Sequence, residues 1–98
     1  MIKLQIQSDT KENAMDIVQT AISAEIKRLE IGLHKTEKQI ERFEKKYNMS
    51  SDTFQKKVAA EDMKEGDREY IEWAGELEVR ERILKDLRNL KDIQYVAQ

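Results

Sequence analysis

Apolar and polar residues alternate at the start of the chain, where the first methionine is followed by Ile-Lys-Leu-Gln-Ile-Gln. The apolar positions are Ile2, Leu4 and Ile6, and a period of two is typical of a strand with one apolar face. We therefore predict a short strand within residues 1–7. A single strand leaves backbone groups unpaired. We expect it to pair with the same strand of a second subunit, with residues 93–96 or with another protein; the alternative is a frayed terminus.

A different period follows, in which apolar residues recur at alternating spacings of four and three. This heptad pattern predicts one long helix over residues 9–47 with a single apolar seam, as in coiled coils. The seam positions are Met15, Gln19, Ile22, Ile26, Leu29, Leu33, Thr36, Ile40, Phe43 and Tyr47. Asp9, with Glu12 three residues later, is expected to cap the start of this helix.

The first helix is expected to stop at Asn48, because asparagine tolerates the left-handed backbone conformation that ends many helices. Ser50 then fits the N-cap of a new helix. Met49 and Phe54 fit the apolar pair that often brackets such a cap. These features predict a short connecting helix over residues 51–60.

The next residues, 61–67, are polar and predict a loop. Asp67 is a candidate cap for a second long helix, which we predict over residues 67–92. The apolar face of this helix consists of Tyr70, Trp73, Ala74, Leu77, Ile83, Leu84, Leu87 and Leu90. Arg80 and Glu81 interrupt that face, so its middle is expected to pack less well.

Five of the six aromatic residues lie between the two long helical patterns. They are Phe43, Tyr47, Phe54, Tyr70 and Trp73. One interpretation is structural, with the rings filling the corner of a helical hairpin. The other is functional, with exposed rings anchoring a partner protein, because aromatic side chains dominate the energy of many interfaces.

Together these elements predict an all-α fold in one domain over residues 1–98. It is a long, coiled-coil-like antiparallel two-helix hairpin with a short connecting helix and a short N-terminal strand. The absence of proline and the charged fraction of 39% favour long helices. The apolar residues suffice for a seam but are few for a compact core, so we expect a homodimer that completes a helical bundle. The residues expected in the core or dimer seam are Ile22, Ile26, Leu29, Leu33, Ile40, Phe43, Leu77, Leu84 and Leu87.

Charge is distributed unevenly along the chain. Residues 31–60 carry a net charge of +3, whereas residues 61–98 carry −4. The two arms of an antiparallel hairpin would thus be complementary in sign, although exposed ion pairs contribute only about 0–1 kcal/mol each. The overall charge of −2 argues against a protein that coats nucleic acid.

The sequence offers little chemistry for catalysis or metal binding. There is no cysteine, which excludes disulfides and thiolate chemistry. The single histidine, His34, has Glu30 one turn before it, and two ligands do not complete a metal site. Residues 61–72 match a calcium loop poorly, because Met63 stands where an oxygen ligand is required. We therefore expect no enzymatic activity, no catalytic residues, no metal and no cofactor.

No apolar run approaches the ~20 residues of a membrane-spanning helix. The start of the chain also lacks the apolar core of a signal peptide. We therefore expect a cytoplasmic protein that does not associate with a membrane.

Two stretches of the chain, GLHKTEKQIERFEKKYNMSSDTF (residues 32–54) and EYIEWAGELE (residues 69–78), resemble a family of small prokaryotic proteins. The shared pattern is Phe-Glu-x-Lys-Tyr-Gly-Met-Ser-Ser-x-x-Phe, then an acidic loop and Glu-Trp. Asn48 stands where the family often has glycine. The resemblance implies a helical hairpin and an antitoxin-like binding role, because members lie beside toxin-like genes. It implies no catalytic residues.

We therefore predict a non-enzymatic protein-interaction module, most concretely the antitoxin-like partner of a toxin-like protein. It would bind by strand addition or through a helix groove. The expected partner-binding residues are Ile2, Leu4, Ile6, Tyr70 and Trp73. One alternative is a self-assembling scaffold bundle. The other is a DNA-binding regulator in which paired N-terminal strands read the major groove, although binding to nucleic acid is not our main expectation.

Overall fold

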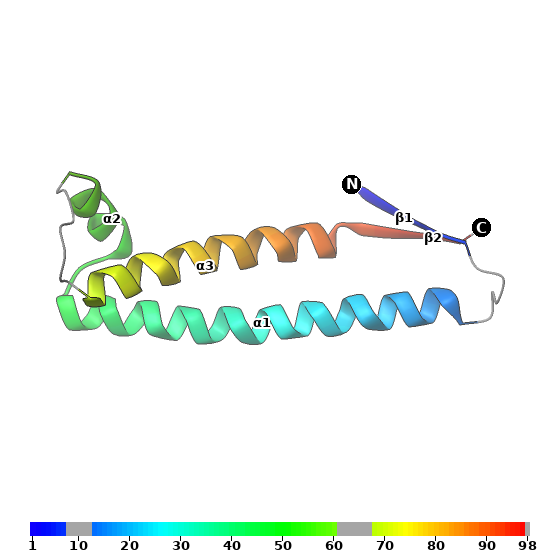
Figure 1. The fold of residues 1–98 in the computed structure, drawn as a ribbon, viewed down its shortest axis with the longest axis horizontal. Helices are drawn as coiled ribbons and strands as arrows, with labels where there is room; N and C mark the ends of the chain where they lie inside the picture. Colours follow the sequence, from blue (N-terminus) through cyan, green and yellow to red (C-terminus); the bar gives the residue numbers. More distant parts are fainter. Residues whose placement is uncertain (8–12, 61–67, 98) are drawn as a thin grey trace. The chain divides into compact units, whose positions relative to one another are not determined.

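The chain is mainly helical in the computed structural model, which describes residues 1–7, 13–60 and 68–97. In chain order the elements are β1 (Ile2–Ile6), α1 (Ala14–Tyr47), α2 (Ser51–Ala60), α3 (Arg68–Lys91) and β2 (Ile93–Ala97) (Figure 1). As the sequence predicts, the fold has two long helices that pack together, a short connecting helix and an N-terminal strand. The predicted caps at Asp9 and Asp67 lie outside the described residues, as does the predicted loop.

The residues form two compact units. The terminal unit comprises Met1–Gly32 with Ile83–Gln98, and the aromatic unit comprises Leu33–Arg82. Both α1 and α3 contribute one part to each unit. In each unit the part of α1 runs antiparallel to the part of α3, as expected for a helical hairpin.

The aromatic unit has a core of large side chains from all three helices. Its buried members are Ile40, Phe43, Phe54, Trp73 and Leu77. Partly buried residues pack around them: Tyr47, Met49, Val58, Tyr70 and Ala74. Met49 and Phe54 thus lie in one cluster, as the predicted pair around the α2 cap requires.

The end of α1 is closed by local hydrogen bonds. The Asn48 N–H donates to the carbonyl of Lys45 at 3.3 Å, and the Met49 N–H donates to the carbonyl of Glu44 at 3.1 Å. This pair is the Schellman motif, which requires a left-handed residue after the helix. Asn48 has a φ of 48°, which confirms the predicted helix stop.

The start of α2 is capped by two side chains. Ser50 Oγ accepts a hydrogen bond from the Thr53 N–H at 3.1 Å, which confirms the predicted N-cap. Glu44 Oε2 accepts another from the Ser51 N–H at 2.9 Å. A carboxylate at a helix start is favourable because the first N–H groups are unpaired and the helix dipole is positive there.

The terminal unit has a thinner interior, in which the large buried side chains are Leu29 and Leu87. A Cβ atom on Gly32 would lie 3.7 Å from Ile83 Cδ1, an ordinary contact distance, so this glycine does not reflect a forced close approach. Lys91 Nζ lies 3.4 Å from Glu30 Oε2, but both side chains are exposed and the pair contributes little.

The predicted seam residues face the interior of the chain itself. Leu29, Ile40, Phe43, Leu77 and Leu87 are buried. The remaining ones are half-buried: Ile22, Ile26, Leu33 and Leu84. Because the hairpin already covers these residues, the expected homodimer stays a prediction.

The fold departs from the all-α prediction at its C-terminal end, where β2 pairs with β1 in a two-stranded sheet. The alternation of Ile93 and Tyr95 carries the signal for this strand, but the segment is only five residues long. A strand as short as β2 depends on its pairing partner, which lies far away in the sequence.

Candidate functional site

The β1–β2 sheet is parallel. Its register pairs Ile2 with Ile93 and Leu4 with Tyr95. Of the three strand partners that the sequence left open, the structure therefore contains the chain's own C-terminal segment. In this register the alternating apolar side chains of β1 and β2 lie on the same face of the sheet.

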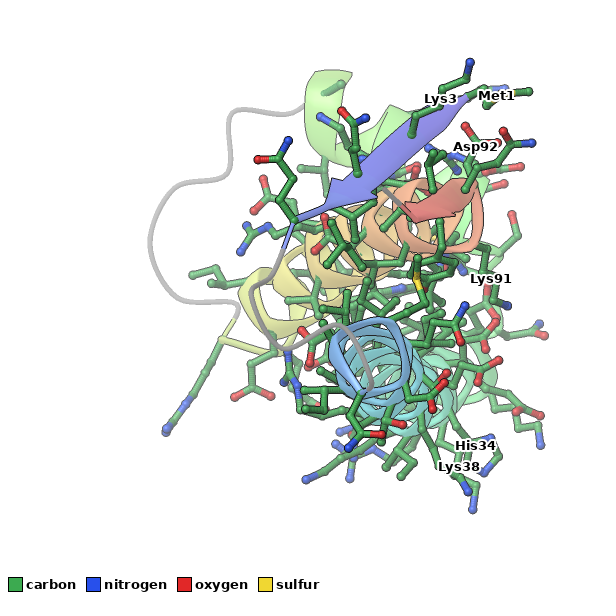
Figure 2. The ribbon with its side chains drawn as sticks, turned by 90° about the vertical axis from the view of Figure 1, so that its right-hand side faces the viewer. Met1, Lys3, His34, Lys38, Lys91 and Asp92 are labelled. Carbon is green, nitrogen blue, oxygen red and sulfur yellow. The ribbon has the colours of Figure 1, made fainter. Side chains whose placement is uncertain are left out.

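The two faces of β1 differ in character. Leu4 and Ile6 are half-buried, whereas Ile2, on the same face, remains 40% exposed. Lys3 and Gln5 are exposed on the opposite face. Figure 2 shows the Lys3 side chain projecting away from the helices of the terminal unit. The predicted strand residues thus lie together, with one apolar side chain at the start of the sheet incompletely covered.

Backbone direction decides which groups of β1 remain available at the sheet edge. The Ile2 N–H donates to the carbonyl of Asp92 at 3.3 Å. Successive residues of a strand direct their backbone groups to opposite edges, so Leu4 also faces β2. Lys3 and Gln5 direct their N–H and C=O groups outward, and we call these groups the β1 edge.

The same alternation applies to β2. Because the carbonyl of Asp92 faces β1, the backbone groups of Ile93 and Tyr95 point away from β1. We call these outward groups the β2 edge. Within the described part of the chain the sheet consists of two strands, so neither edge is covered by a third.

Such a sheet is an unusual end point for a fold. All-parallel sheets occur almost only where both faces are covered, and even a two-stranded hairpin is marginally stable in water on its own. An uncovered strand edge presents N–H and C=O groups that readily pair with another chain. The Met1 amino group lies 3.0 Å from Asp92 Oδ2 at the start of β1 (Figure 2), but both groups are exposed, so this ion pair contributes little.

The aromatic residues serve mainly as core. Trp73 is fully buried, and its ring stacks on Phe54 with centroids 3.9 Å apart and an angle of 4°. The Trp73 indole N–H donates to Ser51 Oγ at 3.0 Å. Trp73 thus fills the hairpin corner and offers no surface to a partner in this conformation, whereas Tyr70 is half-buried. This arrangement supports the structural interpretation of the cluster.

Two side-chain hydrogen bonds join α1 to α3 at the surface of the aromatic unit. Lys46 Nζ and the Tyr47 hydroxyl both donate to Glu69 Oε1. These hydrogen bonds, first that from Lys46 and then that from Tyr47, lower the pKa of the Glu69 carboxyl from its ordinary value. The carboxylate is therefore a hydrogen-bond acceptor that joins α1 to α3.

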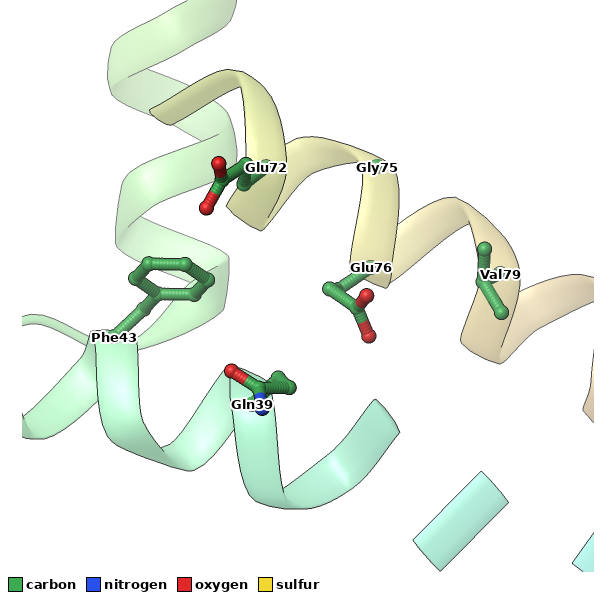
Figure 3. A pocket seen from close by; sticks show the side chains of 6 residues that line it. All are labelled: Gln39, Phe43, Glu72, Gly75, Glu76 and Val79. Atoms are coloured by element: carbon green, nitrogen blue, oxygen red, sulfur yellow. The ribbon is translucent and has the colours of Figure 1, made fainter. Parts of the chain in front are cut away.

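A shallow cavity of about 370 Å³ lies between α1 and α3 in the aromatic unit. It is lined by Gln39, Phe43, Glu72, Gly75, Glu76 and Val79. Figure 3 shows Gln39 and Phe43 of α1 on one side of it and Glu72 and Glu76 of α3 on the other. The lining combines two carboxylates with an aromatic ring.

The exposed side of α1 carries His34 and Lys38, which project together in Figure 2. Among the described residues, no three His, Asp or Glu side chains converge in a way that could hold a metal ion. None of the helices, in their described parts, is long and apolar enough to span a membrane.

The sequence analysis missed two surface features. One is the direction of the two sheet edges, which depends on the β1–β2 pairing. The other is a set of apolar residues off the seam: Ile17, Ile31 and Ile71 are 65%, 66% and 58% exposed. Their positions outside the heptad seam were a visible signal for exposure.

Comparisons with models of known protein families, with curated proteins and with solved structures gave no match. The resemblance to an antitoxin-like family therefore stays a prediction. The candidate site is defined by its geometry: the two edges of a small parallel sheet, neither of which pairs with a third strand among the described residues.

Proposed function

We propose that this chain is a non-enzymatic protein-interaction module that binds by strand addition at the edges of the β1–β2 sheet. The helical hairpin is the scaffold that holds the sheet. In this mode of recognition a partner strand gains affinity from backbone hydrogen bonds and specificity from alternate side chains.

The observation that supports the proposal is the two-stranded parallel sheet itself. At the β1 edge, Lys3 and Gln5 present outward backbone donors and acceptors. At the β2 edge, Ile93 and Tyr95 do the same. A third strand would move one of the existing strands from an edge to a central position, where its backbone groups are fully paired.

The resemblance noted above directs the choice of partner. A toxin-like protein is the partner class to test first, and the present chain would then act as its antitoxin-like partner. Strand addition requires only an extended segment in the partner protein. The proposal therefore does not depend on which reaction, if any, the partner catalyses.

The test isolates the tagged full chain gently from its own cells and reads composition by native mass spectrometry. Two edge variants, Gln5→Pro and Tyr95→Pro, each remove one outward N–H group while sparing the hydrogen bonds between β1 and β2. Gln5→Ala and Tyr95→Ala are the matched controls, because they change the side chain and keep the N–H group.

We expect a stoichiometric second protein with the unmodified chain and with both alanine variants, and its loss with at least one proline variant. Far-ultraviolet circular dichroism checks that the helices persist. The proposal is wrong if the second protein binds all variants equally, or if only copies of this chain are recovered and the proline changes leave their assembly intact. The second result would favour the scaffold alternative.

A further inference from the structure

We propose that the β1 edge is occupied by a second copy of this chain, with the two β1 strands antiparallel about a two-fold axis at Leu4. This inference rests on the proposed function and names the partner at one of the two edges. The β2 edge is then the one left for a different protein.

The outward backbone groups of β1 match this arrangement. With the axis at Leu4, Lys3 lies opposite Gln5 of the second copy. Both residues direct N–H and C=O outward, so each pair exchanges two hydrogen bonds, as a hydrogen-bonded pair of an antiparallel sheet requires. Leu4 then lies opposite Leu4 of the second copy in a non-hydrogen-bonded pair, which suits a residue whose backbone groups face β2.

The side chains match as well. A two-fold axis normal to the sheet keeps the apolar faces of both copies on one side. Ile2 then lies opposite Ile6 of the second copy, which covers a side chain that is 40% exposed in the single chain. On the other face, Lys3 lies opposite the neutral Gln5, so no like charges are opposed.

Other registers fit less well. An axis at Lys3 would place two lysines directly opposite each other, which is destabilising. An axis at Gln5 would leave Ile2 without an opposite residue from β1. The register at Leu4 is the one that engages the whole strand, Ile2–Ile6.

The β2 edge would not provide the same cover. Its outward residues are Ile93, Tyr95 and Ala97, so the two-fold axis that engages the whole strand lies at Tyr95. A second copy paired there would lie beside β2 and leave Ile2 of β1, which is 40% exposed, without an opposite apolar side chain. Self-pairing is therefore favoured at the β1 edge.

The product is a four-stranded sheet in the order β2-β1-β1-β2. A small sheet is stabilised by three or more strands with an apolar face or by packing against a helix, and the second copy supplies the additional strands. The helices of both copies then cover one face, a common layer arrangement.

The test measures the dissociation constant of the purified full chain by sedimentation equilibrium. Gln5→Lys places a lysine opposite Lys3 in both symmetric pairs and should weaken the dimer about five- to tenfold. Gln5→Glu places a carboxylate opposite Lys3 and should strengthen the dimer by a similar factor. The double variant Lys3→Glu/Gln5→Lys restores opposite charges and should return the constant to near its original value.

Gln55→Lys is the matched control, because it makes the same charge change at an exposed residue of α2. It should leave the dissociation constant unchanged. A monomeric parent chain at all concentrations would overturn the inference. So would a dimer that responds equally to Gln5→Lys and Gln5→Glu.

A second measurement tests the register. The chain contains no cysteine, so Leu4→Cys introduces a single thiol that meets its own copy at a distance compatible with a disulfide. Mild oxidation should give a covalent dimer with Leu4→Cys and little with Lys3→Cys or Ile31→Cys. Equal cross-linking of all three would overturn the Leu4 axis.

These experiments separate the inference from the proposed function. If the purified chain stays monomeric while a proline variant loses another bound protein, self-pairing fails and strand addition stands. If the purified chain dimerises as described but no other protein depends on either edge, self-pairing stands and the wider interaction role fails.

Discussion

Asn48 ends α1 in a backbone conformation that most side chains avoid, with a φ of 48°. The left-handed region costs an ordinary L-residue roughly 1–2 kcal/mol, and asparagine is among the few that visit it routinely. The conformation places the N–H groups of Asn48 and Met49 on carbonyls of the last turn. One residue thus determines where α1 stops and where α2 begins.

Substitution at this position should separate backbone from side-chain effects. We expect Asn48→Ala to lower the free energy of unfolding by about 1 kcal/mol, because alanine lacks the short polar side chain that lets asparagine adopt the left-handed region at low cost. Asn48→Gly should leave the stability unchanged or raise it, since glycine adopts φ > 0 without penalty. Urea denaturation followed by circular dichroism measures both. Equal destabilisation by the two variants would contradict the backbone explanation.

For single residues, interactions with close neighbours in the sequence were predictable, and hydrogen bonds between residues far apart in the sequence were not. The roles of Asn48 and Ser50 follow from their own side chains and their immediate neighbours. The hydrogen bond from Trp73 to Ser51 joins residues 22 positions apart, as does the one from Tyr47 to Glu69. No local sequence pattern predicts such pairs, because they depend on how the helices pack against each other.

The heptad seam is the feature that organises the helices. Leu29 is 8% exposed, whereas Ile31, two residues later on the same helix, is 66% exposed. Two similar aliphatic side chains thus differ almost completely in environment. The difference follows from the 100° rotation per residue of an α-helix, which turns Ile31 away from α3.

A matched pair of charge substitutions tests this organisation. Leu29→Asp places a carboxylate in the interior of the terminal unit and should destabilise the chain by several kcal/mol, because a buried charge without a partner is costly. Ile31→Asp should change stability by no more than about 0.5 kcal/mol. Thermal unfolding followed by circular dichroism compares the two. Similar unfolding temperatures would show that the seam does not face inward.

The helices were predictable because their signal repeats over many turns, whereas the pairing of residues 93–96 with the N-terminal strand was one of three alternatives that the sequence left open. No glycine or proline separates Lys91, the end of α3, from Ile93, so no helix-breaking residue marks the change, and the alternation of Ile93 and Tyr95 is a short signal. A parallel pair also gains its stability from a strand distant in sequence. The apolar alternation at Ile2, Leu4 and Ile6 indicated a strand, but the direction of its edges follows only from the pairing with β2.

The two units of the molecule differ in how completely they bury their side chains. The aromatic unit encloses Trp73, Phe43 and Phe54 with at most 2% exposure. In the terminal unit the large buried side chains are Leu29 and Leu87, at 8% and 6%. Local stability follows the density of buried apolar contacts, so the aromatic unit is expected to be the more stable part.

Amide hydrogen exchange of the whole chain measures this difference. Helix α1 provides an internal comparison, because residues 14–32 belong to the terminal unit and residues 33–47 to the aromatic unit. We expect faster exchange in residues 14–32, apart from the frayed first turn. Uniform protection along α1, or slower exchange in its first half, would contradict the expectation.

The pairing of Ile2 with Ile93 has a consequence for the order of folding. Joining segments so far apart pays a large loop-closure entropy and slows the step, whereas helices form from local contacts within microseconds. On a ribosome that adds roughly 5–20 residues per second, β1 waits about 5–20 s for β2. During that interval both of its edges are accessible, including the one that β2 later covers. Under the proposed self-pairing, neighbouring nascent chains on one messenger RNA would compete with β2 for the same strand, and the pace of translation would help decide which partner β1 meets first.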